Sequence, residues 1–144
     1  MPVILNTDIL VALLKGETDA NKAIESLNGN GEQPATTPLT TYELLRGAYI
    51  SSNPQRNIPE VKELLSNMEI LGLTMQACEE AAKIYQDLRK GGRLIGEFDL
   101  LIAAIAKTNA EAVMTRDEHF SRIKGINREN GKLYSCSLRE FSEA

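Results

Sequence analysis

Several polar residues that could bind a metal ion follow short apolar segments of this sequence or lie at the start of a predicted helix. They are Asn6, Asp8, Glu43, Glu97, Asp99 and Asp117. Carboxylates that lie within a few ångströms of one another raise each other's pKa unless a cation keeps them ionised. An oxygen-only cluster suits Mg²⁺ or Mn²⁺ rather than zinc or copper, because sulfur and imidazole are missing from the set.

The apolar pattern predicts that these groups meet, because short strands alternate with helices along the chain. Helices are predicted at 9–14, 19–27, 39–48, 59–68, 78–89, 98–108 and 117–123, strands at 3–5, 35–37, 69–71, 112–115 and 132–135, and a loop at 28–38. This order predicts an α/β fold, a three-layer sandwich with a mainly parallel sheet of about five strands. In such a sheet the ligand site lies outside the carboxyl ends of the strands, which is where these acids fall.

Each acid also has a purely structural interpretation. Asp8, Asp99 and Asp117 precede or open helices, where an aspartate accepts backbone N–H bonds and contributes about 1 kcal/mol. Glu43 can be an exposed helix carboxylate. Asp99 fits this interpretation less well, because it stands directly against the apolar run 100–104 and needs a partner there. The residues alone leave both interpretations open.

The composition is that of an ordinary globular chain. A length of 144 residues predicts one domain over 1–144, and a net charge of −4 lacks the basic footprint of proteins that coat DNA. We expect a cytoplasmic protein without a membrane partner, because the apolar runs are short and the first 14 residues lack the pattern of a secretory signal. Cys78 and Cys136 have no CxxC spacing and are expected to be incidental thiols.

Two other α/β classes are disfavoured. A phosphoacceptor signalling domain needs an aspartate after its third strand, where residues 69–74 read EILGLT, and a Rossmann domain needs a GxGxxG motif after its first strand. His119 is the single histidine, which removes mechanisms that need two imidazoles. Its charged neighbours predict a surface position.

Four segments resemble the motifs of PIN-domain ribonucleases, and specifically of the VapC-type toxins of toxin–antitoxin pairs. They are VILNTDILVALLKG, TTYELLRGA, IGEFDLLIAAIA and VMTRDEHFSRI, of which the third is the most specific, and the resemblance covers nearly the whole chain. It implies a PIN-like fold whose acidic cluster binds Mg²⁺ or Mn²⁺ and cleaves a phosphodiester bond of RNA. It also implies a small VapB-type antitoxin that covers the site, and a homodimer.

The resemblance assigns the catalytic and metal-binding positions to Asn6, Glu43, Asp99 and Asp117, with Glu97 and Asp8 as additional metal-ligand candidates. The first position departs from the family pattern, because Asn6 stands where the family has aspartate. A neutral amide is a poorer ligand for a hard dication, so this change predicts weakened or lost activity.

Two explanations of Asn6 stay open: an engineered, disarmed chain, or a naturally weakened member. Substitution by Asp8 is disfavoured because that residue lies beyond the strand end. A non-catalytic PIN-fold module that binds RNA or protein is the alternative function. Thr7 and Thr115 are candidates for supporting hydrogen bonds, although Thr115 can equally be a plain strand residue.

An RNA substrate needs cations near this edge. Arg46, Arg93 and Arg116 are the RNA-binding candidates, with solvated surface charge as the alternative. Tyr42 and Tyr85 could stack on bases, although aromatic residues at these helical positions are more often packing residues. The apolar helices around 39–50 and 58–65 could form a groove for an amphipathic partner segment, or belong to the core.

Overall fold

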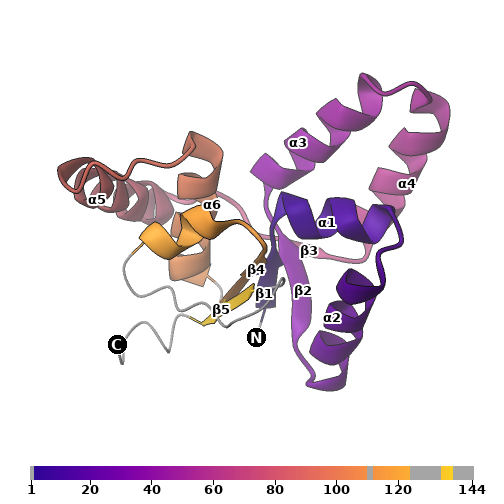
Figure 1. Cartoon of the computed structure of the whole chain (residues 1–144), viewed down its shortest axis with the longest axis horizontal. Helices are drawn as coiled ribbons and strands as arrows, with labels where there is room; N and C mark the ends of the chain where they lie inside the picture. Colours follow the sequence, from indigo (N-terminus) through magenta and orange to yellow (C-terminus); the bar gives the residue numbers. More distant parts are fainter. Residues whose placement is uncertain (1, 110–111, 124–133, 138–144) are drawn as a thin grey trace.

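The computed structural model describes residues 2–109, 112–123 and 134–137 (Figure 1). The strands are β1 (Pro2–Leu5), β2 (Gln33–Thr36), β3 (Glu69–Ile70), β4 (Ala112–Thr115) and β5 (Tyr134–Ser137). The helices are α1 (Thr7–Leu14), α2 (Thr18–Gly29), α3 (Pro38–Tyr49), α4 (Pro54–Ser66), α5 (Met75–Lys90), α6 (Glu97–Asn109) and the short 3₁₀ helix η1 (Glu118–Arg122).

The described strands form one sheet in the order β3-β2-β1-β4-β5. The first four are mutually parallel, and β5 runs antiparallel to β4. The central strand β1 pairs with β2 on one side and β4 on the other, so the carboxyl ends of these three strands share one edge. The predicted α/β architecture with a mainly parallel sheet is confirmed.

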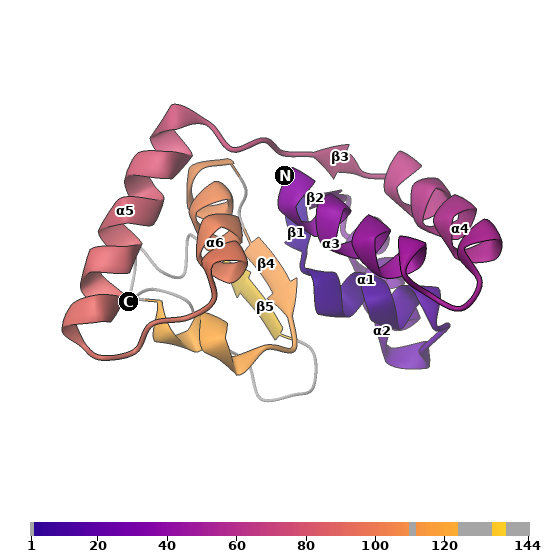
Figure 2. The ribbon, with the colours of Figure 1, turned by 90° about the horizontal axis from the view of Figure 1, so that it is seen from above.

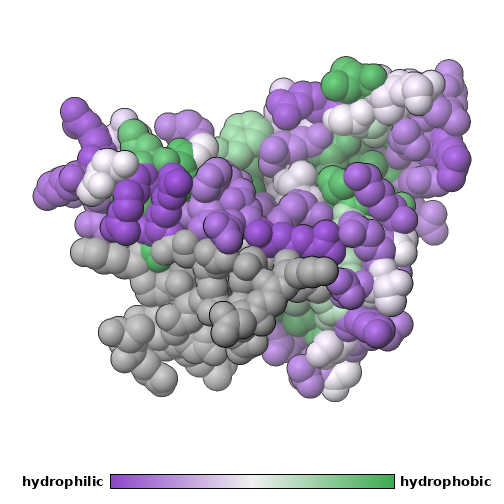
Figure 3. Space-filling model, viewed as in Figure 1, coloured by the Kyte–Doolittle hydropathy of each residue, from purple (hydrophilic) through white to green (hydrophobic). Residues whose placement is uncertain are grey.

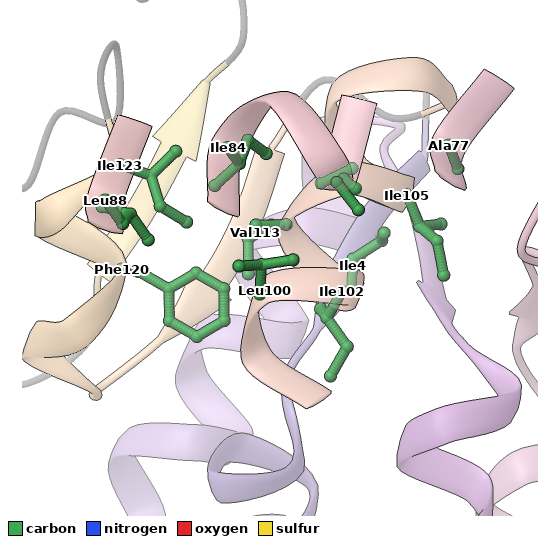
Figure 4. Close-up of a cluster of buried hydrophobic side chains, with 14 of the residues drawn as sticks. Ile4, Ala77, Ile84, Leu88, Leu100, Ile102, Ile105, Val113, Phe120 and Ile123 are labelled. Atoms are coloured by element: carbon green, nitrogen blue, oxygen red, sulfur yellow. The ribbon is translucent and has the colours of Figure 1, made fainter. Parts of the chain in front are cut away.

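Helices cover both faces of the sheet, and the alternation of side chains along the strands explains why both faces are apolar. Val3 and Leu5 point into a core with α1 to α4, whereas Ile4 and Val113 point into a core with α5 and α6. Figure 2 shows the two helical layers on either side of the strands. In the second core, Phe120 of η1 is fully buried and packs with the aliphatic residues of α5 and α6 (Figure 4).

Several predicted helix boundaries were wrong. The helix predicted from Pro59 begins at Pro54, and Pro59 lies inside it. Pro54 suits the start because a first turn needs no N–H there, whereas Pro59 removes one interior hydrogen bond. The predicted loop 28–38 is shorter than expected, because α2 continues to Gly29 and β2 begins at Gln33.

The strand predictions were shifted by one or two residues. Thr37 is the N-cap of α3 rather than part of β2, and its side chain accepts a hydrogen bond from the Thr40 amide. β3 ends at Ile70, although the next amide, of Leu71, still donates to the Thr36 carbonyl at 2.8 Å. The predicted strand 132–135 is β5 at Tyr134–Ser137, and residues 132–133 lie outside the described part. In the described ranges, no helix combines the length and the apolar character that a bilayer crossing needs.

Candidate metal centre

The edge where β1 and β4 end is organised by the hydroxyl of Thr115. Its Oγ1 accepts hydrogen bonds from Asn6 Nδ2 at 3.3 Å and from the Asp117 amide at 3.0 Å. It donates its own proton to the Asp8 carboxylate, at 3.1 Å from Oδ2. Since a hydroxyl has one proton, this network fixes the orientation of the Asn6 amide. Thr115 is therefore more than a plain strand residue, because it joins three of the polar groups predicted from the sequence.

Asp8 is held by hydrogen bonds to the backbone and to Thr115. Its Oδ2 accepts from the Arg116 amide at 2.6 Å, and its Oδ1 accepts from the Ile9 amide at 2.9 Å. These bonds tie the first turn of α1 to the segment that follows β4. The structure thus gives Asp8 a structural role of the kind the sequence left open.

Glu43 comes to the same edge from α3. Its Oε1 accepts a hydrogen bond from Thr7 Oγ1 at 2.9 Å, and Thr7 Oγ1 also lies 3.4 Å from Thr40 Oγ1. Thr7 opens α1 directly after β1, so this bond connects two elements that are far apart in sequence. It fixes one carboxylate oxygen of Glu43 and leaves the other for a different partner.

Asp99 is the acid whose ionisation is most perturbed. It lies half-buried in the first turn of α6, and its pKa is raised from 3.8 to about 6. Burial is the largest cause, followed by the negative charges of Asp117, Glu43 and Asp8, whereas His119 acts in the opposite direction. Among the residues that the structure describes, no hydrogen bond reaches the Asp99 carboxylate. The charge therefore lacks the partner that the sequence argument required.

Asp117 and His119 complete the cluster. Asp117 caps η1 by accepting from the His119 amide at 2.9 Å, and the imidazole Nδ1 lies 3.3 Å from Asp117 Oδ1. One ligand atom from each of Asp99, Asp117 and His119 lies within 4.8 Å of the others. His119 is exposed, as predicted, but the premise that imidazole is missing from this site was wrong.

Asn6 leaves one atom of this edge without a partner. The residue is 4% exposed, and none of the residues that the structure describes donates a hydrogen bond to its Oδ1. An unpaired buried carbonyl oxygen costs about 1–3 kcal/mol, which a cation would offset. Asp99 and Asp117 bring carboxylate oxygens to this edge, and the charge of Glu43 lies close enough to raise the pKa of Asp99. Asn6 is joined to the segment after β4 through Thr115. Carboxylate and amide oxygens are the donor types that suit a divalent ion. The predicted ligand Glu97 is exposed and is not among the charges that shift the pKa of Asp99.

The predicted RNA-binding arginines lie in different surroundings. Arg46 is exposed and lies over the ring of Tyr42, 5.1 Å from its centroid, and Arg93 is exposed in the loop before α6. The Arg116 guanidinium lies 3.3 Å from a carboxylate oxygen of Glu17, so part of its charge is already balanced.

Sequence reasoning missed Arg122, which lies beside the cluster. Its Nη1 donates to the Leu94 carbonyl at 3.0 Å. With Arg116, Asp117 and His119, it lines a polar hollow of about 460 Å³. The sequence signal that could have identified Arg122 is its position five residues after Asp117. The helix η1 turns the chain so that Arg122 comes back toward the acids.

The helical hairpin α3–α4 carries two further hollows. One of about 810 Å³ is mostly apolar and exposes Tyr42, Tyr49, Ile50 and Ile70. Figure 3 shows apolar side chains on the surface of this hairpin. Tyr42 is 52% exposed, so it is not a core residue, although its ring meets Phe98 edge-on. The second hollow, of about 390 Å³ between α1, α3 and α4, includes Thr7 and Glu43 and thus adjoins the metal centre.

Comparison with known proteins identifies the class of this fold and site. The model of the PIN domain family matches residues 3–126, so the chain belongs to the PIN domain family.

Within that family the chain belongs with the VapC ribonucleases. It is 30% identical over 124 residues to ribonuclease VapC1 of Methanocaldococcus jannaschii, covering 85% of this chain and 81% of that protein. It is 27% identical over 127 residues to the tRNA(fMet)-specific endonuclease VapC of Shigella flexneri, covering 88% of this chain and 95% of that one.

Solved structures of VapBC complexes share the fold. One is VapBC2 from Rickettsia felis, which was solved bound to a DNA fragment from the VapBC2 promoter. A chain of that complex superposes with a TM-score of 0.78 at 28% identity. That match covers 85% of this chain and 93% of the other. A chain of DNA-bound VapBC from Salmonella typhimurium gives a TM-score of 0.79 at 28% identity, covering 90% and 97%. The resemblance to VapC-type toxins seen in the sequence motifs is confirmed.

Proposed function

We propose that this chain is a divalent-metal-dependent endoribonuclease, the toxin of a toxin–antitoxin pair, with activity weakened by Asn6. The observation that carries the proposal is the convergence of Glu43, Asp99 and Asp117 with the unpaired Oδ1 of Asn6 at one sheet edge. These four residues would hold Mg²⁺ or Mn²⁺. When bound, such an ion activates water and neutralises charge on a phosphodiester during hydrolysis.

The protein's own groups have separate tasks in this proposal. The Thr115 hydroxyl orients the Asn6 amide, and the Thr7 hydroxyl orients Glu43. With no cation bound, the pKa of Asp99 is about 6, so its carboxyl group is mostly protonated below that pH. Above it the ionised carboxylate can bind a cation. Arg116 and Arg122 face the polar hollow beside the acids, where they can attract RNA phosphates. Arg46 and Arg93 would extend the positive surface farther along the RNA.

Asn6 sets the expected level of activity. Aspartate at this position would add a negative charge beside the Thr115 hydroxyl and strengthen the hold on a dication. An amide oxygen supplies only a dipole, so metal affinity and cleavage should both be lower than with aspartate. The alternative function, a PIN-fold module that binds RNA or protein without cutting, is favoured by this same residue.

RNA cleavage by three forms of the chain tests the proposal. Single-stranded RNA is incubated with Mg²⁺ or Mn²⁺, or with EDTA, and with the wild type, Asn6→Asp and the double variant Asn6→Asp/Asp99→Asn. We expect Asn6→Asp to cleave faster than the wild type, and the double variant and the EDTA samples to be inactive. Folded Asn6→Asp protein that neither cleaves RNA nor binds Mn²⁺ more tightly would favour the binding module.

An antitoxin partner is part of the same proposal. The hollow between α1, α3 and α4 offers Val11, Leu14 and Val61 to apolar side chains of a VapB-type segment, and Glu43 to a basic one. The solved relatives that are VapBC complexes support this partner. A segment seated there would lie against Thr7 and Glu43, and would obstruct the metal centre. Growth arrest by Asn6→Asp that a co-expressed antitoxin relieves would support it.

We also propose that the chain forms a homodimer through the apolar hollow of the α3–α4 hairpin. Tyr49 is 61% exposed and Ile50 is 80% exposed there. A two-fold interface would bury both residues in each of the two protomers. Sedimentation of the wild type beside Tyr49→Glu tests this, with a dimer expected only for the wild type. The cytoplasmic location expected from the sequence stays a prediction.

A further inference from the structure

We propose that His119 is a metal ligand, which makes this centre prefer Mn²⁺ to Mg²⁺. The inference rests on the metal centre of the proposed function and adds a nitrogen donor to its oxygen set. Neither the sequence argument nor the family resemblance placed a histidine among the ligands.

The positions of three ligand atoms carry the inference. Imidazole Nδ1 lies 3.3 Å from Asp117 Oδ1, and atoms of Asp99, Asp117 and His119 all lie within 4.8 Å of one another. Ligands at about 2.0–2.3 Å from a common ion are separated by distances of this order. Within the part of the chain that the structure describes, the partners of the imidazole are the same two acids, Asp117 at hydrogen-bond range and Asp99 through its charge. The ring is therefore free to turn Nδ1 toward an ion shared with the two aspartates.

A second observation independently points to a cation at this place. Asn6 is 4% exposed, and its Oδ1 has no hydrogen-bond partner in the described ranges 2–109, 112–123 and 134–137. The same side chain donates through Nδ2 to Thr115 Oγ1, which also accepts from the Asp117 backbone amide, so the Thr115 hydroxyl joins Asn6 to the backbone at Asp117. A buried carbonyl oxygen at the strand end next to the segment that carries Asp117, with no described donor, would be satisfied by an ion bound at this edge.

The donor types decide which ion is preferred. Mg²⁺ favours oxygen ligands in a near-ideal octahedron and keeps several waters, whereas a nitrogen donor is better tolerated by transition metals, among which Mn²⁺ is the one that also suits carboxylate and carbonyl oxygens. Replacing a carboxylate at the first position by an amide also removes negative charge, on which Mg²⁺ depends most. A set of two carboxylates, one amide oxygen and one imidazole thus favours Mn²⁺.

Pulsed electron paramagnetic resonance of bound Mn²⁺ tests the ligand directly. A coordinated imidazole gives a nitrogen coupling on the Mn²⁺ signal, and in the untagged chain the single histidine is His119. The experiment compares the wild type with protein labelled with ¹⁵N-histidine and with His119→Gln. We expect a ¹⁴N coupling in the wild type that changes to the ¹⁵N pattern on labelling and is lost in His119→Gln.

Calorimetry at a fixed pH supplies the second readout. We expect His119→Gln to weaken Mn²⁺ binding by about tenfold or more, with a smaller loss for Mg²⁺. Asp19→Asn, which removes an exposed acid from the first turn of α2, is the control for an acid outside the metal centre and should leave both affinities unchanged. Mn²⁺ bound without a histidine coupling, or an equal loss for both metals, overturns this inference alone. No binding of either metal by the wild type overturns the metal centre as well.

Discussion

Two neighbouring parallel strands end in aspartate-containing segments that the structure uses in opposite ways. Asp8, after β1, accepts hydrogen bonds from the Ile9 and Arg116 amides and from Thr115 Oγ1. Asp117, after β4, accepts one from the His119 amide and otherwise faces His119 and another acid, Asp99. The first carboxylate is satisfied by the protein itself, whereas the second still needs a positive partner. Position at the end of a strand is thus not enough to make an aspartate a metal ligand.

Thr115 explains how one edge supports both roles. Its single proton goes to Asp8, and its lone pairs accept from Asn6 and from the Asp117 backbone. The satisfied aspartate therefore holds the segment from which the unsatisfied one projects. Substitution of Asp8 should therefore lower the stability of the fold, and substitution of Asp117 should lower the affinity for the metal ion.

The largest expected effect is on metal binding by Asp117. We expect Asp117→Asn to weaken Mn²⁺ binding by about 10- to 100-fold, because the amide loses the charge but keeps the cap of η1. Asp8→Asn is the matched variant and should change the affinity by less than about threefold. Titration calorimetry measures both. Equal losses for the two variants would contradict the division of roles.

The next effect is on stability, with the order of the two sites reversed. Asp8→Ala removes the acceptor for two backbone amides and a buried hydroxyl, which should lower the free energy of unfolding by about 2–3 kcal/mol. Asp117→Ala loses one cap hydrogen bond and should cost about 1 kcal/mol. Urea denaturation in EDTA compares them, and a larger loss for Asp117→Ala would refute the comparison.

A third effect follows from the raised pKa of Asp99. Its pKa in the folded chain is about 6, against an ordinary value of 3.8, so the folded state holds the proton more tightly. Asp99 does not affect the free energy of unfolding below about pH 4, where it is protonated in both states. The free energy of unfolding falls as the pH rises from 4 to 6, and the whole loss is present above pH 6.

Asp99→Asn should therefore stabilise the metal-free protein at pH 7 by about 1 kcal/mol, a figure reduced for the solvent that reaches this half-buried carboxyl. The gain should vanish near pH 4. Unfolding in EDTA at both pH values measures the difference. A gain that is the same at both would show that the cost of ionising Asp99, which burial and then the neighbouring carboxylates raise, is not its cause.

The smallest expected effect is at Thr7. Thr7→Val removes the hydrogen bond to Glu43 and should lower the free energy of unfolding by about 0.5–1 kcal/mol. It should also weaken Mn²⁺ binding by a few-fold, because Glu43 loses its fixed orientation. Thr7→Ser keeps the hydroxyl and should behave as the wild type. If Thr7→Ser weakens binding as much as Thr7→Val, the hydroxyl does not position Glu43.

The sequence predicted which acids share an edge because strand ends can be read from apolar runs. Glu43, Asp99 and Asp117 follow from that pattern. His119 and Arg122 could not be found in this way, since they reach the site through η1, a 3₁₀ helix with little periodicity of its own. The sequence offered a backbone-bonding role for Asp8, but its partners Thr115 and Arg116 could not be predicted, because they lie more than a hundred residues away.

The convergence of distant segments on one ion is tested most directly by NMR line broadening with Mn²⁺. Substoichiometric Mn²⁺ is added to the ¹⁵N-labelled wild type, and the loss of each backbone amide signal is followed. We expect signals of residues 6–8, 43, 97–99 and 115–119 to vanish together, while those of α2 and of the middle of α5 persist. Broadening confined to one of these segments, or spread evenly over exposed acids, would contradict a common centre.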